Sequence, residues 1–302
     1  MEQLFSNYDS ALANFFRIHE FVENASYILF SLMIIELVFD YFAKRDRNYK
    51  ETASNFMVGL PFEFFSHLFT RSLIAIGLFS LIPFQIISIK VALWTWPIAI
   101  LAADFSYYWA HRLEHRSRIF WAHHSVHHSS TDFNFTTALR VAWQESLVTW
   151  LYLVPFVLVG FHPFQLLISY SMIDIYQTWT HTQKIKRMPE WIEHLINTPS
   201  NHRVHHGANP QYIDKNYGAF LMIWDRLFGT YEKENEKVIF GLTKNINSIN
   251  PLVVNFNAYF PIFADLKKCR NIKSIFKCIL GPPSEEIQSK QLSPPKEHEV
   301  IF

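Results

Sequence analysis

The chain has 302 residues, of which 50% are hydrophobic, 17% aromatic and only 18% charged. Soluble domains carry roughly 25% charged residues, so this chain has less polar material than a water-exposed surface requires. The net charge of +1 gives no reason to expect nucleic acid as a partner, and two cysteines, Cys269 and Cys278, argue against a disulfide framework and exclude a thiolate-rich metal site.

The N-terminal third contains two long apolar regions. Residues 1–24 lack the basic start of a cleaved signal peptide, so we expect membrane insertion to rely on internal segments. The first apolar segment runs from about Ala25 to Phe42 and is followed by Lys44, Arg45, Arg47 and Lys50. The second region, about Asn55 to Ala110, is long enough for two membrane passes of roughly 20 residues each, with Pro83 as the turn.

A third apolar region, Ser146 to Ile173, has no formally charged residue and carries a His162-Pro163 pair near its middle. It predicts a helical hairpin. The expected fold is therefore an all-α integral membrane protein with about five membrane-embedded helices. The basic cluster after the first segment belongs on the cytosolic side by the positive-inside rule, which puts every histidine cluster on that side, in a helical metal-binding cap.

We expect three parts of the chain: an N-terminal segment (1–24), a membrane-embedded catalytic domain (25–239) and a C-terminal cytosolic or interfacial region (240–302) with a flexible tail. The basic stretch Lys267–Lys277 fits either contact with anionic lipid or a solvated helix face. No retrieval signal for the endoplasmic reticulum is evident, which favours a bacterial inner membrane over that compartment.

The strongest local signal is a set of histidine motifs. Three dense motifs have histidines three or four residues apart, a spacing that puts side chains on one helical face. They are His111-Arg-Leu-Glu-His115, His124-Ser-Val-His127-His128 and His202-Arg-Val-His205-His206. A fourth, Gln177-Thr-Trp-Thr-His181, adds a ninth histidine.

The number of histidines indicates two metal ions. A zinc site uses three or four protein ligands, so one ion cannot use nine, whereas two ions with four or five nitrogens each can. Imidazole suits iron, zinc and copper alike. His123 falls outside the spacing and is interpreted as a neighbour. Asp104, seven residues before His111, and Gln177 are candidates for supporting roles around the metals, and Asp104 fits a helix-end charge equally well.

His111-Arg-Leu-Glu-His115 alone also fits the inverted zinc-protease pattern, with Glu114 as general base. That interpretation leaves six clustered histidines without a role.

These motifs resemble those of the fatty acid hydroxylase (sterol desaturase) superfamily. Longer runs resemble the alkylglycerol monooxygenases within it: Asp104 to Arg112, Trp121 to Ser130, Thr137 to Arg140, Asn197 to Ser200, His202 to Gly207, Ile213 to Gly218 and Trp224 to Thr230. The resemblance covers roughly Asp104 to Asn257.

The resemblance implies a non-haem di-iron centre held by the nine motif histidines, and O2-dependent hydroxylation of a membrane lipid. For an ether lipid it implies cleavage through a hemiacetal, with electrons from tetrahydrobiopterin or another donor such as a redox protein.

Three other functions stay open at this point. They are an acyl, sphingoid or sterol hydroxylase or desaturase, a membrane zinc hydrolase, and a haem- or metal-binding carrier. The sequence leaves the oligomeric state open.

Overall fold

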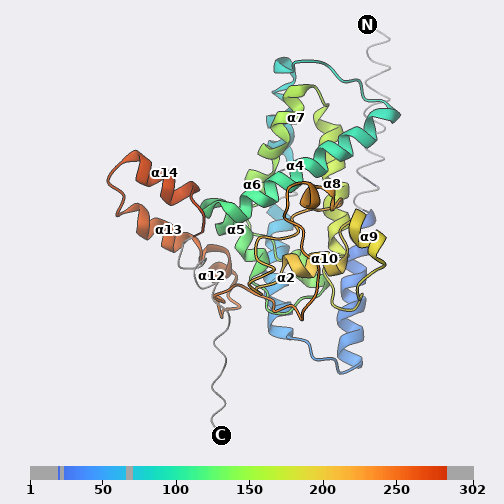
Figure 1. Cartoon of the computed structure of the whole chain (residues 1–302), viewed down its shortest axis with the longest axis vertical. Helices are drawn as coiled ribbons and strands as arrows, with labels where there is room; N and C mark the ends of the chain where they lie inside the picture. The colour runs from blue at the N-terminus through green and yellow to red at the C-terminus, as the bar shows by residue number, and fades with distance from the viewer. Residues whose placement is uncertain (1–19, 21–23, 66–70, 284–302) are drawn as a thin grey trace.

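The computed structural model describes residues 20, 24–65 and 71–283, and within these ranges the chain is helical with two isolated β-bridges in place of strands (Figure 1). The prediction of an all-α fold is therefore confirmed for the described chain. After an N-terminal helix at Asn24–Phe42, the elements are α2 (Tyr49–Phe65), α3 (Arg71–Phe79), α4 (Trp96–Arg116), α5 (Arg118–His128), α6 (Ser146–Thr149), α7 (Val154–Val159), α8 (Pro163–Thr178), α9 (Glu190–Leu195), α10 (Pro199–His205), α11 (Ile223–Leu227), α12 (Pro251–Phe256), α13 (Tyr259–Leu266) and α14 (Ile272–Leu280).

The Asn24–Phe42 helix is the one helix of the described residues that is long and apolar enough to cross a membrane by itself. Only 17% of its apolar stretch is buried in the protein, and Ile28, Ile35 and Phe42 are exposed. A soluble protein rarely leaves so much contiguous apolar surface open to water. The expected number of about five membrane-embedded helices stays a prediction, because only one helix passes this test. The three-part division of the chain also stays a prediction.

The predicted hairpin in Ser146–Ile173 is confirmed as helices α7 and α8. Gly160 ends α7 with φ at +139°, a backbone conformation that favours glycine, and Pro163 begins α8. Leu78 of α3, Ala99 of α4, Val157 of α7 and Leu166 of α8 form an apolar core between these helices. Pro83 lies in a short 3-10 turn after α3, within the turn predicted for it.

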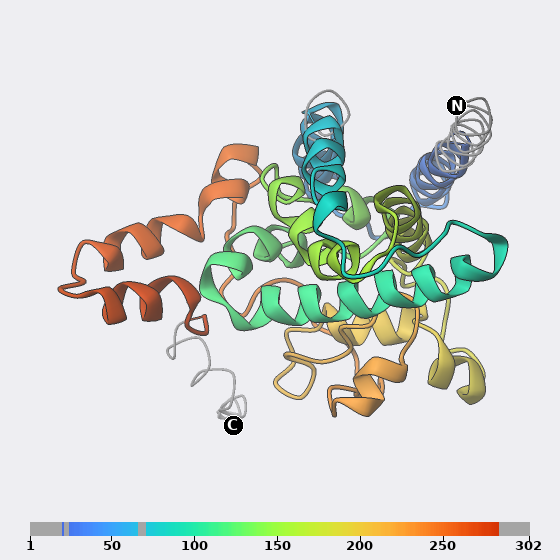
Figure 2. The ribbon, with the colours of Figure 1, turned by 90° about the horizontal axis from the view of Figure 1, so that it is seen from above.

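Helix α4 positions the histidine motifs. It is seen along its length in Figure 2, where the N-terminal helix is seen nearly end-on, so the two cross at a steep angle. Ser117, with an extended backbone, separates α4 from α5 and turns the chain sharply. The last turns of α4 therefore face the histidines of α5, while α8 packs along the other side of α4.

The C-terminal helices α13 and α14 form a hairpin that projects from the body (Figures 1 and 2). Ile262 and Cys278 fix its base on Ala122 of α5. Its remaining apolar side chains are largely exposed, among them Phe263 and Phe276.

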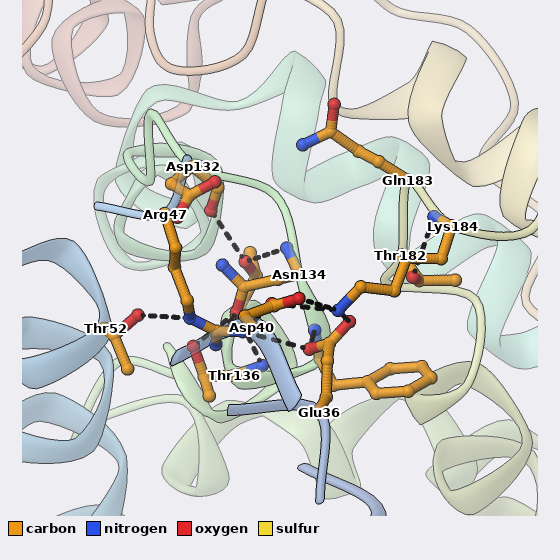
Figure 3. Close-up of polar contacts among 12 residues, drawn as sticks. Glu36, Asp40, Arg47, Thr52, Asp132, Asn134, Thr136, Thr182, Gln183 and Lys184 are labelled. Atoms are coloured by element: carbon orange, nitrogen blue, oxygen red, sulfur yellow. Dashed lines mark hydrogen bonds and ion pairs between the residues drawn. The ribbon is translucent and has the colours of Figure 1, made fainter. Parts of the chain in front are cut away.

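Three buried charges and one exposed lysine fasten the N-terminal helix to the rest of the protein. This ionic clamp consists of Glu36, Asp40, Arg47 and Lys184 (Figure 3). The Arg47 guanidinium lies 2.7 Å from Asp40 and 3.4 Å from Glu36, and it donates to Asn134 at 2.8 Å. The Lys184 amine lies 2.9 Å from Glu36 and 2.8 Å from Asp40. The clamp thus joins one apolar helix to the loops that follow α5 and α8.

We expect Arg47→Met to lower the free energy of unfolding by about 3 kcal/mol, because it leaves two buried carboxylates with one remaining cation. Thermal unfolding in detergent measures the loss. Arg45→Met is the matched control, since Arg45 is exposed and its loss should change little. Equal shifts for the two variants would show that the clamp does not stabilise the fold.

Candidate metal centre

The structure brings all nine predicted histidines into two adjoining clusters. The five-histidine cluster consists of His111, His115, His124, His128 and His205. The four-histidine cluster consists of His127, His181, His202 and His206. Within each cluster every residue offers a ligand atom within 4.8 Å of the others, and the clusters meet where the His128 and His206 rings stack at 4.4 Å.

Each His-x-x-His-His motif is divided between the two clusters. In α5, His124 and His128 join the five-histidine cluster and His127 joins the other. In α10 the division is reversed, with His202 and the C-cap residue His206 in the four-histidine cluster and His205 in the other. Residues four apart lie on one helical face, whereas neighbours point about 100° apart. The three- and four-residue spacing therefore brings two rings of each His-x-x-His-His motif to one cluster, while the third ring belongs to the other cluster.

Backbone carbonyls determine how several of the rings are protonated. The Nδ1 atoms lie 2.8 Å from the Tyr217 carbonyl oxygen for His111 and 3.0 Å from that of Lys215 for His205. They lie 3.0 Å from the Gln177 oxygen for His181 and 3.3 Å from that of Arg140 for His127. A carbonyl can only accept, so each Nδ1 carries the proton and each Nε2 keeps its lone pair in the neutral ring.

These lone pairs face one another inside the clusters. The Nε2 atoms of His127 and His181 lie 3.2 Å apart, and both rings hold their proton at the opposite nitrogen. His205 and His115 each present a buried Nε2 with no hydrogen-bond partner among the described residues. Converging lone pairs repel unless a cation lies between them, and buried polar atoms normally have a partner. The donor set therefore fits two metal ions.

Burial favours the neutral form that metals bind in eight of the nine imidazoles. It lowers the pKa of His127 to about 4. Burial, followed by the charges of neighbouring histidines, holds the pKa of His124, His128 and His206 well below the ordinary value. No proton has to be displaced at neutral pH when an ion enters.

Two carboxylates support the five-histidine cluster. Glu114 lies 3.2 Å from His124 Nδ1, and Asp214 lies 3.5 Å from His115 Nδ1. A carboxylate on the outer nitrogen orients a ligand imidazole and makes it more basic. Sequence spacing missed Asp214, which lies 99 positions after its histidine; the only signal was its place in the Ile213–Gly218 run.

The two supporting residues proposed from the sequence make their contacts through backbone groups. Asp104 accepts from the backbone N–H groups of Phe220 and Leu221 and from the Trp224 indole, so these bonds fix a loop and do not reach an imidazole. Gln177 supports His181 through its carbonyl oxygen. Burial and these bonds make Asp104 neither a tautomer-holding group nor an exposed helix-end charge.

A cleft at the surface leads to the five-histidine cluster. Its lining includes His115, His128 and His205 together with Leu242 and Thr243. Part of the lining thus comes from the segment that follows the last histidine motif.

An all-helical chain with two adjoining histidine clusters fits the class of histidine-motif membrane proteins that the sequence predicted. Comparison with known proteins agrees, since residues 96–230 match the family model described as fatty acid hydroxylase. The chain belongs to the fatty acid hydroxylase superfamily.

Several relatives are alkylglycerol monooxygenases. The chain is 39% identical over 254 residues to an alkylglycerol monooxygenase of Homo sapiens. This alignment covers 81% of the chain and 55% of the human protein. The chain is 45% identical over 162 residues to one of Xenopus tropicalis, covering 53% and 36%. It is also 29% identical over 153 residues to a Delta(7)-sterol 5(6)-desaturase of Aspergillus fumigatus, covering 49% and 40%. The chain spans about half the length, or less, of these relatives, and no solved structure matches it.

The divided motifs predict a difference between two double variants. His202→Ala with His206→Ala removes two ligands of one cluster, so one ion should be lost while the affinity for the other stays unchanged. His205→Ala with His206→Ala, adjacent in sequence, removes one ligand from each cluster and should weaken both ions by at least roughly 10-fold.

Competition with a chelator, followed by metal analysis, distinguishes the two patterns. Circular dichroism checks that both variants keep their helices. If both doubles released one ion and spared the other equally, each motif would serve a single metal and the division would be wrong.

Proposed function

We propose that this chain is a membrane-bound di-iron lipid monooxygenase that uses O2 to hydroxylate a C–H bond. The observation that carries the proposal is the pair of converging imidazole clusters in a chain of the fatty acid hydroxylase superfamily. Iron is the metal that the family implies, and when bound it supplies the activation of O2. Nine histidines in groups of five and four would hold two ions.

The protein's own contribution is to hold the ligands and exclude water. The carbonyls of Tyr217 and Gln177 keep two of the rings in the orientation that a metal requires. Phe133 packs on His206 at 4.9 Å between ring centres and stacks on Phe240 at 4.7 Å. This apolar cover limits access of water to the four-histidine cluster, which protects a reactive centre from side reactions.

We take an ether lipid as the first substrate to test. Hydroxylation of the carbon next to an ether oxygen gives a hemiacetal, which separates into an aldehyde and an alcohol without a hydrolytic base. Relatives named alkylglycerol monooxygenase support this choice. The electron donor is proposed to be tetrahydrobiopterin or a redox protein.

An acyl, sphingoid or sterol hydroxylase or desaturase is the second candidate. The relative named as a sterol desaturase favours it, because the same ligand set can serve either outcome. A zinc hydrolase that uses Glu114 as its base is disfavoured, since one oxygen of this carboxylate faces the outer nitrogen of His124. A haem carrier is likewise disfavoured, since it has no use for nine converging imidazoles.

We propose that the Asn24–Phe42 helix and neighbouring apolar helices sit in the membrane, with the histidines on the cytosolic side. Lys44 and Arg45 follow that helix, as the positive-inside rule requires of a cytosolic end. The projecting α13–α14 hairpin supports contact with the membrane surface, because exposed Phe263 and Phe276 accompany the basic Lys267–Lys277 stretch. The membrane itself, bacterial or endoplasmic-reticular, stays a prediction.

The test is metal analysis and product analysis of the detergent-purified protein. We expect about two irons per chain and aldehyde release from an alkylglycerol that requires O2 and a reductant. His206→Ala should abolish the product. Two irons with a hydroxylated or desaturated acyl product would reject the ether substrate and keep the class. Bound zinc with O2-independent turnover would reject the oxygenase.

A further inference from the structure

A third group of metal-binding side chains lies directly beside the paired centre. Glu114 comes from α4, His123 from α5, and Glu145 directly precedes α6. Each offers a ligand atom, and these atoms lie within 4.8 Å of one another. None of the three belongs to either histidine cluster, and His123 has no role in the proposed oxygenase.

His123 points its Nε2 into this group. Its side chain is only 3% exposed, and its Nε2 has no hydrogen-bond partner among the described residues. The same nitrogen lies 3.6 Å from a Glu114 oxygen and 3.7 Å from a Glu145 oxygen. A buried imidazole nitrogen is costly to leave unpaired, so a ligand between the three side chains is the simplest way to satisfy it.

The distances suit an ion better than direct hydrogen bonds. They exceed the usual range for N–H···O bonds, which ends at about 3.2 Å. Ligands bound at about 2.1 Å in a tetrahedral arrangement are roughly 3.4 Å apart, close to both separations found here. The small difference requires only a slight inward movement of each side chain.

The charge of the group also favours a cation. Two carboxyl groups, those of Glu114 and Glu145, lie close together in the interior, and a divalent ion between them would compensate their charge. Glu145 is partly exposed, with 21% of its side chain open, so an ion can enter from that side and keep bound water. Burying paired carboxylates without a compensating charge is unfavourable.

We propose that Glu114, His123 and Glu145 bind a third divalent ion of the zinc or manganese type, separate from the paired centre. Two oxygens and one nitrogen are a mixed donor set that suits such ions. Glu114 links the sites, because one of its oxygens faces His124 Nδ1 and the other faces His123. The third ion would thereby fix the position of a ligand of the five-histidine cluster. This inference does not depend on the oxygenase activity.

Zinc counting on the full-length protein tests the third site. The detergent-purified chain is saturated with Zn²⁺, freed of excess by gel filtration and analysed by mass spectrometry. We expect about three zinc ions per chain for the wild type and about two for His123→Gln and for Glu145→Gln. His162→Gln is the matched control; its ring is a partly buried histidine away from all three groups, so it should keep the wild-type count.

Each result decides the question. A wild-type count of two, or a His123→Gln count equal to the wild type, would overturn the proposal. Retention of two ions in both variants shows that the paired centre has folded, so a loss of one ion is specific. Glu114→Gln is left out of the test because Glu114 also contacts His124.

Discussion

The candidate metal centre depends on hydrogen bonds between imidazole rings and backbone carbonyls. A histidine becomes a ligand only when its proton sits on the nitrogen that faces away from the metal, and a carbonyl acceptor enforces that arrangement. The acceptors for His111 and His205 come from the Lys215–Tyr217 segment. This segment contains no histidine. It nevertheless determines which nitrogen carries the proton in two of the five rings of one cluster.

That loop is in turn held by two buried aspartates. Asp225 accepts from the backbone N–H groups of Tyr217 and Gly218 at 2.8 and 2.7 Å, and Asp104 accepts from that of Phe220. A Cβ at position 218 would lie 2.8 Å from the Asp225 carboxylate, so this approach requires glycine. Asp104 thus supports His111 indirectly, through the loop, although both residues lie on α4 about two turns apart.

The sequence predicted the helical fold, the hairpin at Gly160 and which nine histidines lie together, because these follow from local periodicity and turn chemistry. The partners of the rings could not be predicted in the same way. Asp214 meets His115 across the fold, and carbonyl oxygens carry no signal in a sequence. The division of each motif was within reach, since His127 and His128 must point about 100° apart on one helix. The seven-residue spacing of Asp104 from His111 suggested a contact between the carboxylate and the imidazole. The carboxylate instead accepts hydrogen bonds from the loop that contains Phe220.

The two clusters differ in their electrostatic surroundings. Imidazole ligands are neutral, so two bound divalent ions would bring four positive charges that the ligands do not offset. The Asp214 carboxylate and the Glu114 carboxyl, whose pKa burial raises to about 8, lie on outer nitrogens of the five-histidine cluster. His127 and His181 of the other cluster contact carbonyls at Nδ1. Negative charge close by stabilises the higher positive charge on a metal. An ion among the five histidines would therefore be more stable in its higher oxidation state than an ion in the four-histidine cluster. The two positions would then be inequivalent before any substrate binds.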